Sequence, residues 1–317
     1  MPVTTVEGFR HEALLYEGEH EFVAATTAFL REGAAAGEPT LAVVDAPKIA
    51  ALQSSLGADA DRVQFADMSV VGQNPARLIP VWRRFVDDHG RGTGRPLRGV
   101  GEPIWPGRSP VELVECRHHE ALLNVAFADT PAFRLLCPYD TAKLDPAVVE
   151  QSRRTHPWVS GCVDGNHRGP NARYDGTDPD DLFGEPLDPP PAAGDVHELA
   201  FDKLKPVRRF VESAAVDAGF DTATVADIVL AVDEIAANSI RHGGGRGRLS
   251  TWYDGGSWVC EVTDRGRVTD PLIGRREPIG AQVSGRGLWM VNQICRLLQV
   301  RTTPAGTTFR LHFTWRR

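Results

Sequence analysis

Three polar side chains recur at intervals of four residues late in the chain: Glu234, Asn238 and His242. An α-helix would place them on one face, because residues four apart are neighbours on a helix surface. A carboxylate, an amide and an imidazole would then line one wall of a site. His242 would contact phosphates or cap the helix, and the three glycines that follow it slightly favour capping.

A second candidate contact lies at Asp264, which ends an apolar strand pattern and is followed by Gly266 after one intervening residue. Here a carboxylate can accept a hydrogen bond from the amino group of adenine, and Gly266 would leave room for the ring. The alternative is a turn aspartate beside a glycine, which is common without any ligand.

Two further segments could hold phosphates. Gly285, Arg286 and Gly287 precede a predicted helix, whose free backbone N–H groups and positive end attract anions. Thr307 or Thr308, in the last predicted hairpin, would add a hydroxyl group. A bare GxG is a weak signal, but together with the residues above it predicts an ATP pocket whose walls come from separate elements.

In this order and at these separations, the four segments resemble the N, G1 and G2 boxes of the GHKL ATPase/kinase superfamily, and within it the RsbW-type anti-sigma-factor serine kinases. The resemblance covers roughly the last third of the chain and implies a Bergerat α/β sandwich that binds ATP and Mg²⁺. It implies that Asn238 coordinates Mg²⁺ and that Glu234 is the general base towards the incoming hydroxyl. The implied ATP-binding residues are Asn238, Asp264, Gly266, Gly285, Arg286, Gly287, Thr307 and Thr308.

The chain departs from this pattern at two positions. RsbW-type kinases can carry a phosphate-contacting arginine two residues before the GxG, where this chain has Val283. The wider superfamily often has a second glycine after the G1 box, where this chain has Val268. The composition between the boxes predicts a lid over the nucleotide, in which Arg275 or Arg276 would neutralise the γ-phosphate.

The resemblance leaves two functional classes open. The first is a serine kinase that phosphorylates an anti-anti-sigma (STAS) partner and sequesters a sigma factor; Glu234 favours it. The second is a binding module in which ATP supports partner docking without phosphotransfer, and Val283 is compatible with it. A sensor histidine kinase is a distant third, because the residues after His119 and Glu120 do not continue the H-box pattern and instead predict a packed helix. RsbW-type kinases commonly pair with themselves, so a homodimer also remains open.

The elements that must position these residues follow from apolar periodicity. In the last third of the chain we expect helices on one face of a mixed sheet. The expected strands are 196–200, 249–254, 258–264, 299–303 and 307–313, and the expected helices are 203–218, 222–241 and 287–298.

Strand and helix patterns alternate in the first half of the chain, which predicts a mostly parallel, three-layer, RecA-like α/β domain. The expected strands are 40–44, 63–66, 97–100 and 133–137, and the expected helices are 19–32, 47–56, 76–88 and 111–127. The glycines at 33 and 37 loosely imitate a P-loop. However, Glu38 stands where its lysine should be, and the segment leads from helix to strand, so we predict no ATP site there.

Other residues of this domain resemble the MEDS sensory domain of bacterial regulators, which implies a small-molecule or other signal. The matching segments are Arg10-His11, Leu14-Leu15-Tyr16, Gly101-Glu102-Pro103-Ile104-Trp105, Glu115-Cys116-Arg117, His119 to Asn124, Cys137-Pro138-Tyr139-Asp140 and Thr155-His156-Pro157. Ligands of parallel sheets usually lie beyond the carboxyl ends of strands, so we expect a sensory pocket at Glu102, Trp105 and Tyr139. Equally, Trp105 and Tyr139 could cap the core and Glu102 a helix.

Several cysteines and histidines of the same domain are of the residue types that bind zinc: Cys116, His118, His119, Cys137 and His156. They form no paired CxxC or HxxxH, which favours buried thiols and histidines with ordinary hydrogen bonds. The five cysteines of the chain are odd in number and scattered, which is typical of reduced thiols.

Length and composition indicate the domain organisation. The 317 residues favour two domains, and a Gly/Asp/Pro-rich stretch predicts a linker between them at 164–194. The linker would join a sensory domain, 8–163, to an ATP-binding kinase domain, 195–315. A net charge of −7 argues against direct nucleic-acid binding through a dominant basic surface. We expect a soluble cytoplasmic protein, because the sequence shows neither a signal-peptide pattern nor an apolar run approaching the ~20 residues that span a bilayer.

Overall fold

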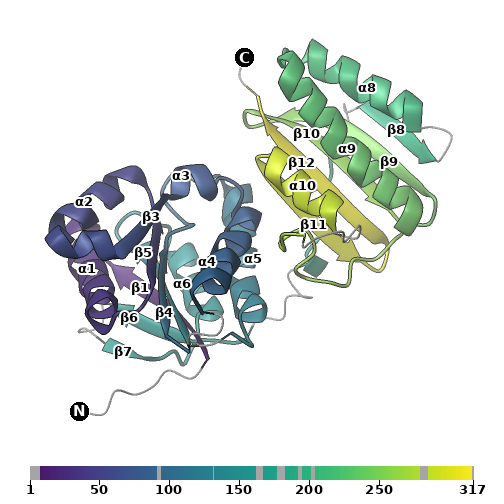
Figure 1. Cartoon of the computed structure of the whole chain (residues 1–317). Coiled ribbons are helices and arrows are strands. Elements are labelled where there is room, and N and C mark those ends of the chain that lie inside the picture. Colours follow the sequence, from purple (N-terminus) through teal and green to yellow (C-terminus); the bar gives the residue numbers. More distant parts are fainter. Residues whose placement is uncertain are drawn as a thin grey trace. The chain divides into compact units, whose positions relative to one another are not determined.

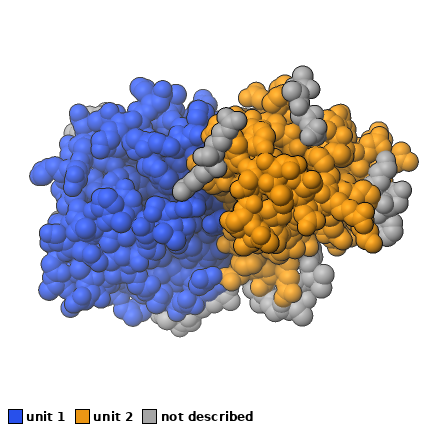
Figure 2. Space-filling model, turned by 90° about the horizontal axis from the view of Figure 1, so that it is seen from above, with its two compact units in different colours: residues 1–178 blue, residues 179–317 orange. Residues whose placement is uncertain are grey.

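The computed structural model of the chain describes residues 8–90, 94–130, 132–161, 167–176, 183–191, 195–200, 204–278 and 285–315. The chain divides into two compact units, Met1–Asp178 and Pro179–Arg317, which Figure 2 distinguishes by colour. Among the described residues, no helix is both long and apolar enough to cross a membrane.

Unit 1 is built on a seven-stranded sheet of order β3-β2-β4-β5-β1-β6-β7. The strands are β1 (Phe9–Tyr16), β2 (Thr40–Val44), β3 (Val63–Asp67), β4 (Leu97–Gly101), β5 (Phe133–Asp140), β6 (Trp158–Gly161) and β7 (His167–Pro170). Every pairing is parallel except that of β6 with β7. The predicted mostly parallel sheet is therefore confirmed.

Helices cover both faces of this sheet, giving three layers (Figure 1). They are α1 (Gly18–Ala36), α2 (Ala46–Leu56), α3 (Met68–Val71), α4 (Leu78–Gly90), α5 (Pro110–Ala126) and α6 (Pro146–Thr155), with 3-10 turns at Gly57–Arg62 and Pro75–Arg77. All residues of β2 and β4 are buried, as expected for strands covered on both faces.

The centre of the sheet differs from the sequence-based expectation, which did not assign β1 as a strand. This strand lies between β5 and β6, and its last six residues are buried. Because β1 pairs with β5 up to Leu15↔Tyr139 and Tyr16↔Asp140, β5 runs three residues beyond the predicted end at 137. Tyr139 therefore lies within a strand and not beyond its carboxyl end.

Unit 2 contains a five-stranded sheet of order β11-β12-β10-β9-β8. Its strands are β8 (Asp195–Ala200), β9 (Arg246–Asp254), β10 (Ser257–Asp264), β11 (Leu297–Thr303) and β12 (Gly306–Thr314). All four pairings are antiparallel, so the prediction of a mixed sheet was wrong. The helices α8 (Leu204–Asp217), α9 (Thr222–His242) and α10 (Arg286–Ile294) lie on one face of the sheet, as predicted (Figure 1).

Helix α10 ends earlier than its apolar pattern predicted. Its last residue is Ile294, and Leu297 and Leu298 instead begin β11, where they pair with His312 and Leu311 of β12. Apolar residues of a short helix and of a buried strand look alike in sequence, so the boundary was not visible there.

The start of α5 generates a stability prediction. Ser109 and Glu112 form a capping box, with the backbone N–H of Ser109 donating to Glu112 Oε2 at 2.8 Å. We expect Ser109→Ala to lower the free energy of unfolding by about 1 kcal/mol, because an N–H group of the first turn loses its acceptor. Ser109→Thr, which keeps the hydroxyl, should lose less. Urea unfolding of both variants checks this; equal losses would show that the cap contributes nothing.

Candidate functional site

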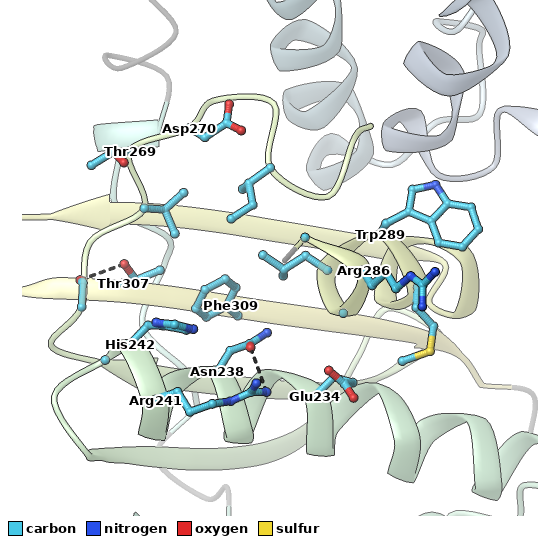
Figure 3. Close-up of a pocket in the computed structure, with 18 of the residues that line it drawn as sticks. Glu234, Asn238, Arg241, His242, Thr269, Asp270, Arg286, Trp289, Thr307 and Phe309 are labelled. Atoms are coloured by element: carbon cyan, nitrogen blue, oxygen red, sulfur yellow. Dashed lines mark hydrogen bonds between the residues drawn. The ribbon is translucent and has the colours of Figure 1, made fainter. Parts of the chain in front are cut away.

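A cavity of about 1100 Å³ opens in unit 2, and separate elements form its walls (Figure 3). Helix α9 contributes one wall, and the end of β10 with the segment after it contributes the next. The first turn of α10 and strand β12 complete the lining. This is the arrangement that the order of motifs predicted.

Helix α9 presents polar side chains to the cavity. Its N-terminus is capped by Asp221, and its apolar residues, such as Ile228 and Ile235, are buried. Glu234 and Asn238 are half-buried along the cavity wall, and Asn238 Oδ1 accepts a hydrogen bond of 3.3 Å from Arg241.

The last turn of α9 places His242 at the cavity. The backbone N–H of Gly243 closes the helix by donating to the carbonyl of Ser239 at 2.7 Å. The imidazole of His242 lines the cavity (Figure 3). His242 is thus placed to contact a ligand.

Asp264 both shapes a turn and lines the cavity. One carboxylate oxygen accepts a hydrogen bond of 2.7 Å from the N–H of Gly266, and Thr307 Oγ1 donates to the carbonyl of Gly266 at 2.9 Å. A Cβ atom on Gly266 would lie 2.7 Å from the carbonyl oxygen of His242, so only glycine lets this turn pack against the end of α9. The turn and ligand interpretations of Asp264 are compatible.

The start of α10 lies directly against α9. Gly285 precedes the helix with φ 88°, a left-handed conformation that favours glycine. A Cβ atom at Gly287 would lie 2.6 Å from Glu234 Oε2 and 3.4 Å from Asn238 Nδ2. The GxG therefore brings the N–H groups of a helix start, which lack intrahelical partners, next to Glu234 and Asn238.

The two threonine candidates of strand β12, Thr307 and Thr308, differ in their position relative to the cavity. Thr307 and Phe309 line the cavity, whereas Thr308 is not among the lining residues. Successive side chains of a strand point to opposite faces, which explains the difference.

Three basic side chains line the cavity, Arg241, Arg267 and Arg286, and of these only Arg286 was predicted as a ligand contact. Neither Arg275, which is buried, nor Arg276, which pairs with Asp270 at 3.0 Å, is a lining residue. Val268 lines the cavity, and Val283 lies outside the described residues.

Sequence reasoning missed the apolar part of the lining, which includes Ile273, Trp289 and Phe309. The positions of Phe309 and Trp289 in the sequence could have indicated that they line the cavity. Phe309 follows Thr307 by two positions in a strand, and Trp289 follows Arg286 by three in a helix, so each shares a face with a predicted residue.

In unit 1, two predicted sensory residues already have partners. Buried Glu102 accepts hydrogen bonds from Tyr16 Oη at 2.8 Å and from Lys48 Nζ at 2.5 Å. Burial raises the pKa of Glu102, and the ammonium group of Lys48 opposes this shift. Trp105 lies beneath the guanidinium of Arg108, which is 3.7 Å from the ring centroid.

The third predicted sensory residue, Tyr139, lies elsewhere. It borders a cavity of about 10 Å³, roughly enough for one water molecule, and its ring contacts His156 edge-on. Neither Glu102 nor Trp105 lines that cavity. The structure thus does not gather the three residues around one pocket.

Comparisons with known proteins agree with this division into two kinds of unit. Residues 10–157 match the family model of MEDS, the methanogen/methylotroph, DcmR sensory domain, and residues 198–313 match the histidine kinase-like ATPase domain. The chain therefore joins a MEDS domain to a histidine kinase-like ATPase domain.

Among solved structures, the RsbU and RsbW domains of Rv1364c from Mycobacterium tuberculosis align with 20% sequence identity and a TM-score of 0.30. The alignment covers 39% of this chain and 33% of that chain. No curated protein matches the sequence significantly.

The packing at Gly243 generates a second stability prediction. A Cβ atom there would lie 2.3 Å from Asp264 Cγ and 2.5 Å from the carbonyl oxygen of Ser239. We expect Gly243→Ala to destabilise unit 2 by about 1–3 kcal/mol, because the end of α9 and the Asp264 turn must separate. Gly184→Ala is the matched control, since no atom lies within 4 Å of its Cβ position. Urea unfolding should separate the two variants; equal effects would contradict the close approach.

Proposed function

We propose that the protein is a signal-responsive anti-sigma regulator whose C-terminal domain binds Mg-ATP and phosphorylates a serine of an anti-anti-sigma (STAS) partner. The observation that carries this proposal is the contact among Glu234, Asn238 and Gly287. It places a carboxylate, an amide and the anion-attracting start of α10 within a few ångströms of one another. A terminal phosphate held at the helix start would have a base and a metal ligand beside it.

The cavity suits a nucleotide in size and in the distribution of its groups. Its volume of about 1100 Å³ is slightly above the ~300–1000 Å³ usual for ligand pockets. Apolar Ile273 and Phe309 lie in the same lining as Asp264, which matches the demand of an adenine ring for apolar faces and a polar edge. The basic residues Arg241 and Arg286 suit the phosphates.

Each polar side chain then has a role in the proposed reaction. Glu234 would accept the proton of the partner's serine as its oxygen attacks the γ-phosphate. Asn238 would hold Mg²⁺ through Oδ1, exchanging its contact with Arg241 for the metal. Bound Mg²⁺ supplies charge neutralisation for the phosphates. The hydroxyl of Thr307, beside Gly266, would support the nucleotide from β12.

The regulatory role follows from the fusion of the two domains. Unit 1, as a MEDS domain, would receive a small-molecule or other signal, and the kinase output would respond to it. Phosphorylation adds negative charge to the STAS partner, which is a suitable means of changing its affinity and so the sequestration of a sigma factor. Pairing of two kinase domains into a homodimer belongs to the same proposal.

The second candidate is an ATP-dependent docking module without phosphotransfer. Val283, in the place of a phosphate-contacting arginine, is compatible with it. The third, a histidine kinase phosphorylated at His119, is disfavoured because His119 is only 1% exposed within α5. A phosphoacceptor must be reachable from a separate catalytic domain.

One labelling experiment distinguishes the three. The full chain is incubated with γ-labelled ATP, Mg²⁺ and candidate STAS proteins, and the label is then tested for acid stability. Acid-stable label on a partner serine supports the kinase. Acid-labile label on this chain supports the histidine kinase, and tight ATP binding without any label supports the docking module.

Replacing Glu234, the proposed general base, should slow phosphotransfer without changing the binding of ATP. We expect Glu234→Gln to lower the rate of phosphotransfer by about 10²–10⁴-fold, the usual contribution of a general base, while the Kd for ATP stays unchanged. The control is Glu212→Gln on the exposed side of α8. Single-turnover transfer and equilibrium ATP binding are measured on each variant. Transfer at the wild-type rate would remove Glu234 as the base.

Asp264 should determine which nucleobase the site prefers. ITP carries a carbonyl where ATP carries the adenine amino group, so the Asp264 carboxylate should favour ATP by about 10- to 100-fold in Kd. We expect Asp264→Ala to reduce this ratio to near one, while Asp254→Ala, at the distant end of β9, keeps it. Because a ratio is measured, general weakening of the site does not mimic the effect. An unchanged ratio would place adenine elsewhere.

A further inference from the structure

Four metal-binding side chains meet in the interior of unit 1, away from the nucleotide cavity. They are His11 of β1, Glu120 of α5, Cys137 of β5 and His156, which follows α6. Each is at most 2% exposed, and their ligand atoms all lie within 4.8 Å of one another. Four elements of the fold thus contribute one donor each.

The contacts within this cluster have the spacing of a tetrahedral coordination shell. Glu120 Oε2 lies 3.0 Å from His11 Nε2 and 3.2 Å from His156 Nε2, and Cys137 Sγ lies 3.3 Å from His11 Nε2. Zn²⁺ bonds of about 2.0–2.3 Å at tetrahedral angles put ligand atoms about 3.3–3.6 Å apart. The remaining pairs of ligand atoms lie within 4.8 Å, so the side chains would have to move by up to about 1 Å to close around the ion.

Hydrogen bonds outside the cluster orient both imidazoles for ligation. His156 Nδ1 lies 2.7 Å from the carbonyl oxygen of Ser152, which can only accept, so Nδ1 carries the proton. His11 Nδ1 lies 3.1 Å from Asn124 Oδ1, and the amide of Asn124 is held in this orientation because its Nδ2 donates to the carbonyl of Thr155 at 2.8 Å. In the neutral rings each Nε2 then carries a lone pair that faces the cluster. Metal-binding histidines are usually held in this way.

Two Nε2 lone pairs and a carboxylate oxygen converge beside the Cys137 thiol. His156 Nε2 and Glu120 Oε1 have no hydrogen-bond partner among the described residues. Buried polar atoms normally have partners, and a cation at the centre of the cluster would satisfy these acceptors. A proton can join only two of these atoms, whereas a divalent cation can join all four donors.

We propose that His11, Glu120, Cys137 and His156 form a closed, structural Zn²⁺ site inside the MEDS domain. When the zinc–sulfur bond forms, the Cys137 thiol releases its proton to solvent, which leaves a thiolate. One thiolate, one carboxylate, two neutral imidazoles and Zn²⁺ sum to zero charge, which suits a site without water access. Because all four positions of the shell are filled by protein, the ion ties β1 and β5 to α5 and to the segment after α6.

The test uses the full chain and cobalt as the probe. After removal of metal with a chelator, Co²⁺ is titrated into the folded protein and the absorption spectrum is recorded. We expect saturation at one equivalent, with a thiolate-to-cobalt charge-transfer band in the near ultraviolet and intense visible bands of tetrahedral Co²⁺. Zn²⁺ should then displace the cobalt and abolish the bands. Absence of the bands in folded wild-type protein would overturn the proposal.

Variants identify the ligands. Cys137→Ser should lose the charge-transfer band, whereas Cys116→Ser should keep it, because Cys116 is equally buried but bonds to the carbonyl of Pro103 outside the cluster. Asn124→Ala keeps every ligand and should weaken Co²⁺ binding about 10- to 100-fold with the band intact. Persistence of the band in folded Cys137→Ser, or its loss in Cys116→Ser, would contradict this assignment. If Cys137→Ser does not fold, the wild-type titration and Asn124→Ala decide.

Discussion

The candidate site depends on one close approach of two helices. At Gly287 the backbone of α10 lies so near Glu234 of α9 that a single added carbon would come within 2.6 Å of the carboxylate. This contact brings a carboxylate and an amide from one helix to the start of another, and neither helix alone has this combination. A second close approach, where Gly243 meets Asp264, fixes the C-terminal end of α9 against β10. At both places a glycine lies against a side chain of the other element, so the geometry of the cavity depends on the small size of these two glycines.

Most helices and strands could be predicted from the sequence, because their apolar periods differ and because turns rich in Gly and Pro separate them. Other features could not, among them the elements β1, β6, β7, α3 and α6. The direction of strands in unit 2 was misjudged, since the apolar pattern of a strand does not state which way its neighbours run. Strand β1 was missed because Arg10, His11 and Glu12 interrupt the apolar pattern that Ala13 begins. Those polar residues are tolerated in the sheet because Glu12 pairs with Arg10 and Arg168, and His11 meets Glu120.

Site residues were predictable where a short sequence spacing translates into a spatial one. The four-residue interval of Glu234 and Asn238 places both on one wall, and the alternation along β12 decides between Thr307 and Thr308. Contacts between residues far apart in the chain could not be predicted from sequence spacing. His11 and Cys137 are 126 residues apart, and His11 and Glu120 are 109 apart, so spacing rules for zinc sites argued against a metal that the folded arrangement favours. For the same reason the predicted sensory residues proved to lie in separate surroundings.

Two sets of polar groups, one in each unit, have different surroundings, and this difference indicates where chemistry can occur. In unit 1, Glu102 and Lys48 are largely buried and are satisfied by each other and by Tyr16. Breaking such a set would leave a charge without water or partner, which is costly, so these groups hold the fold together. In unit 2, Glu234 and Asn238 are only half-buried at the edge of a large cavity. Water solvates them there, and an incoming phosphate can replace that water without breaking the core, so unit 2 can exchange a ligand while its fold stays intact.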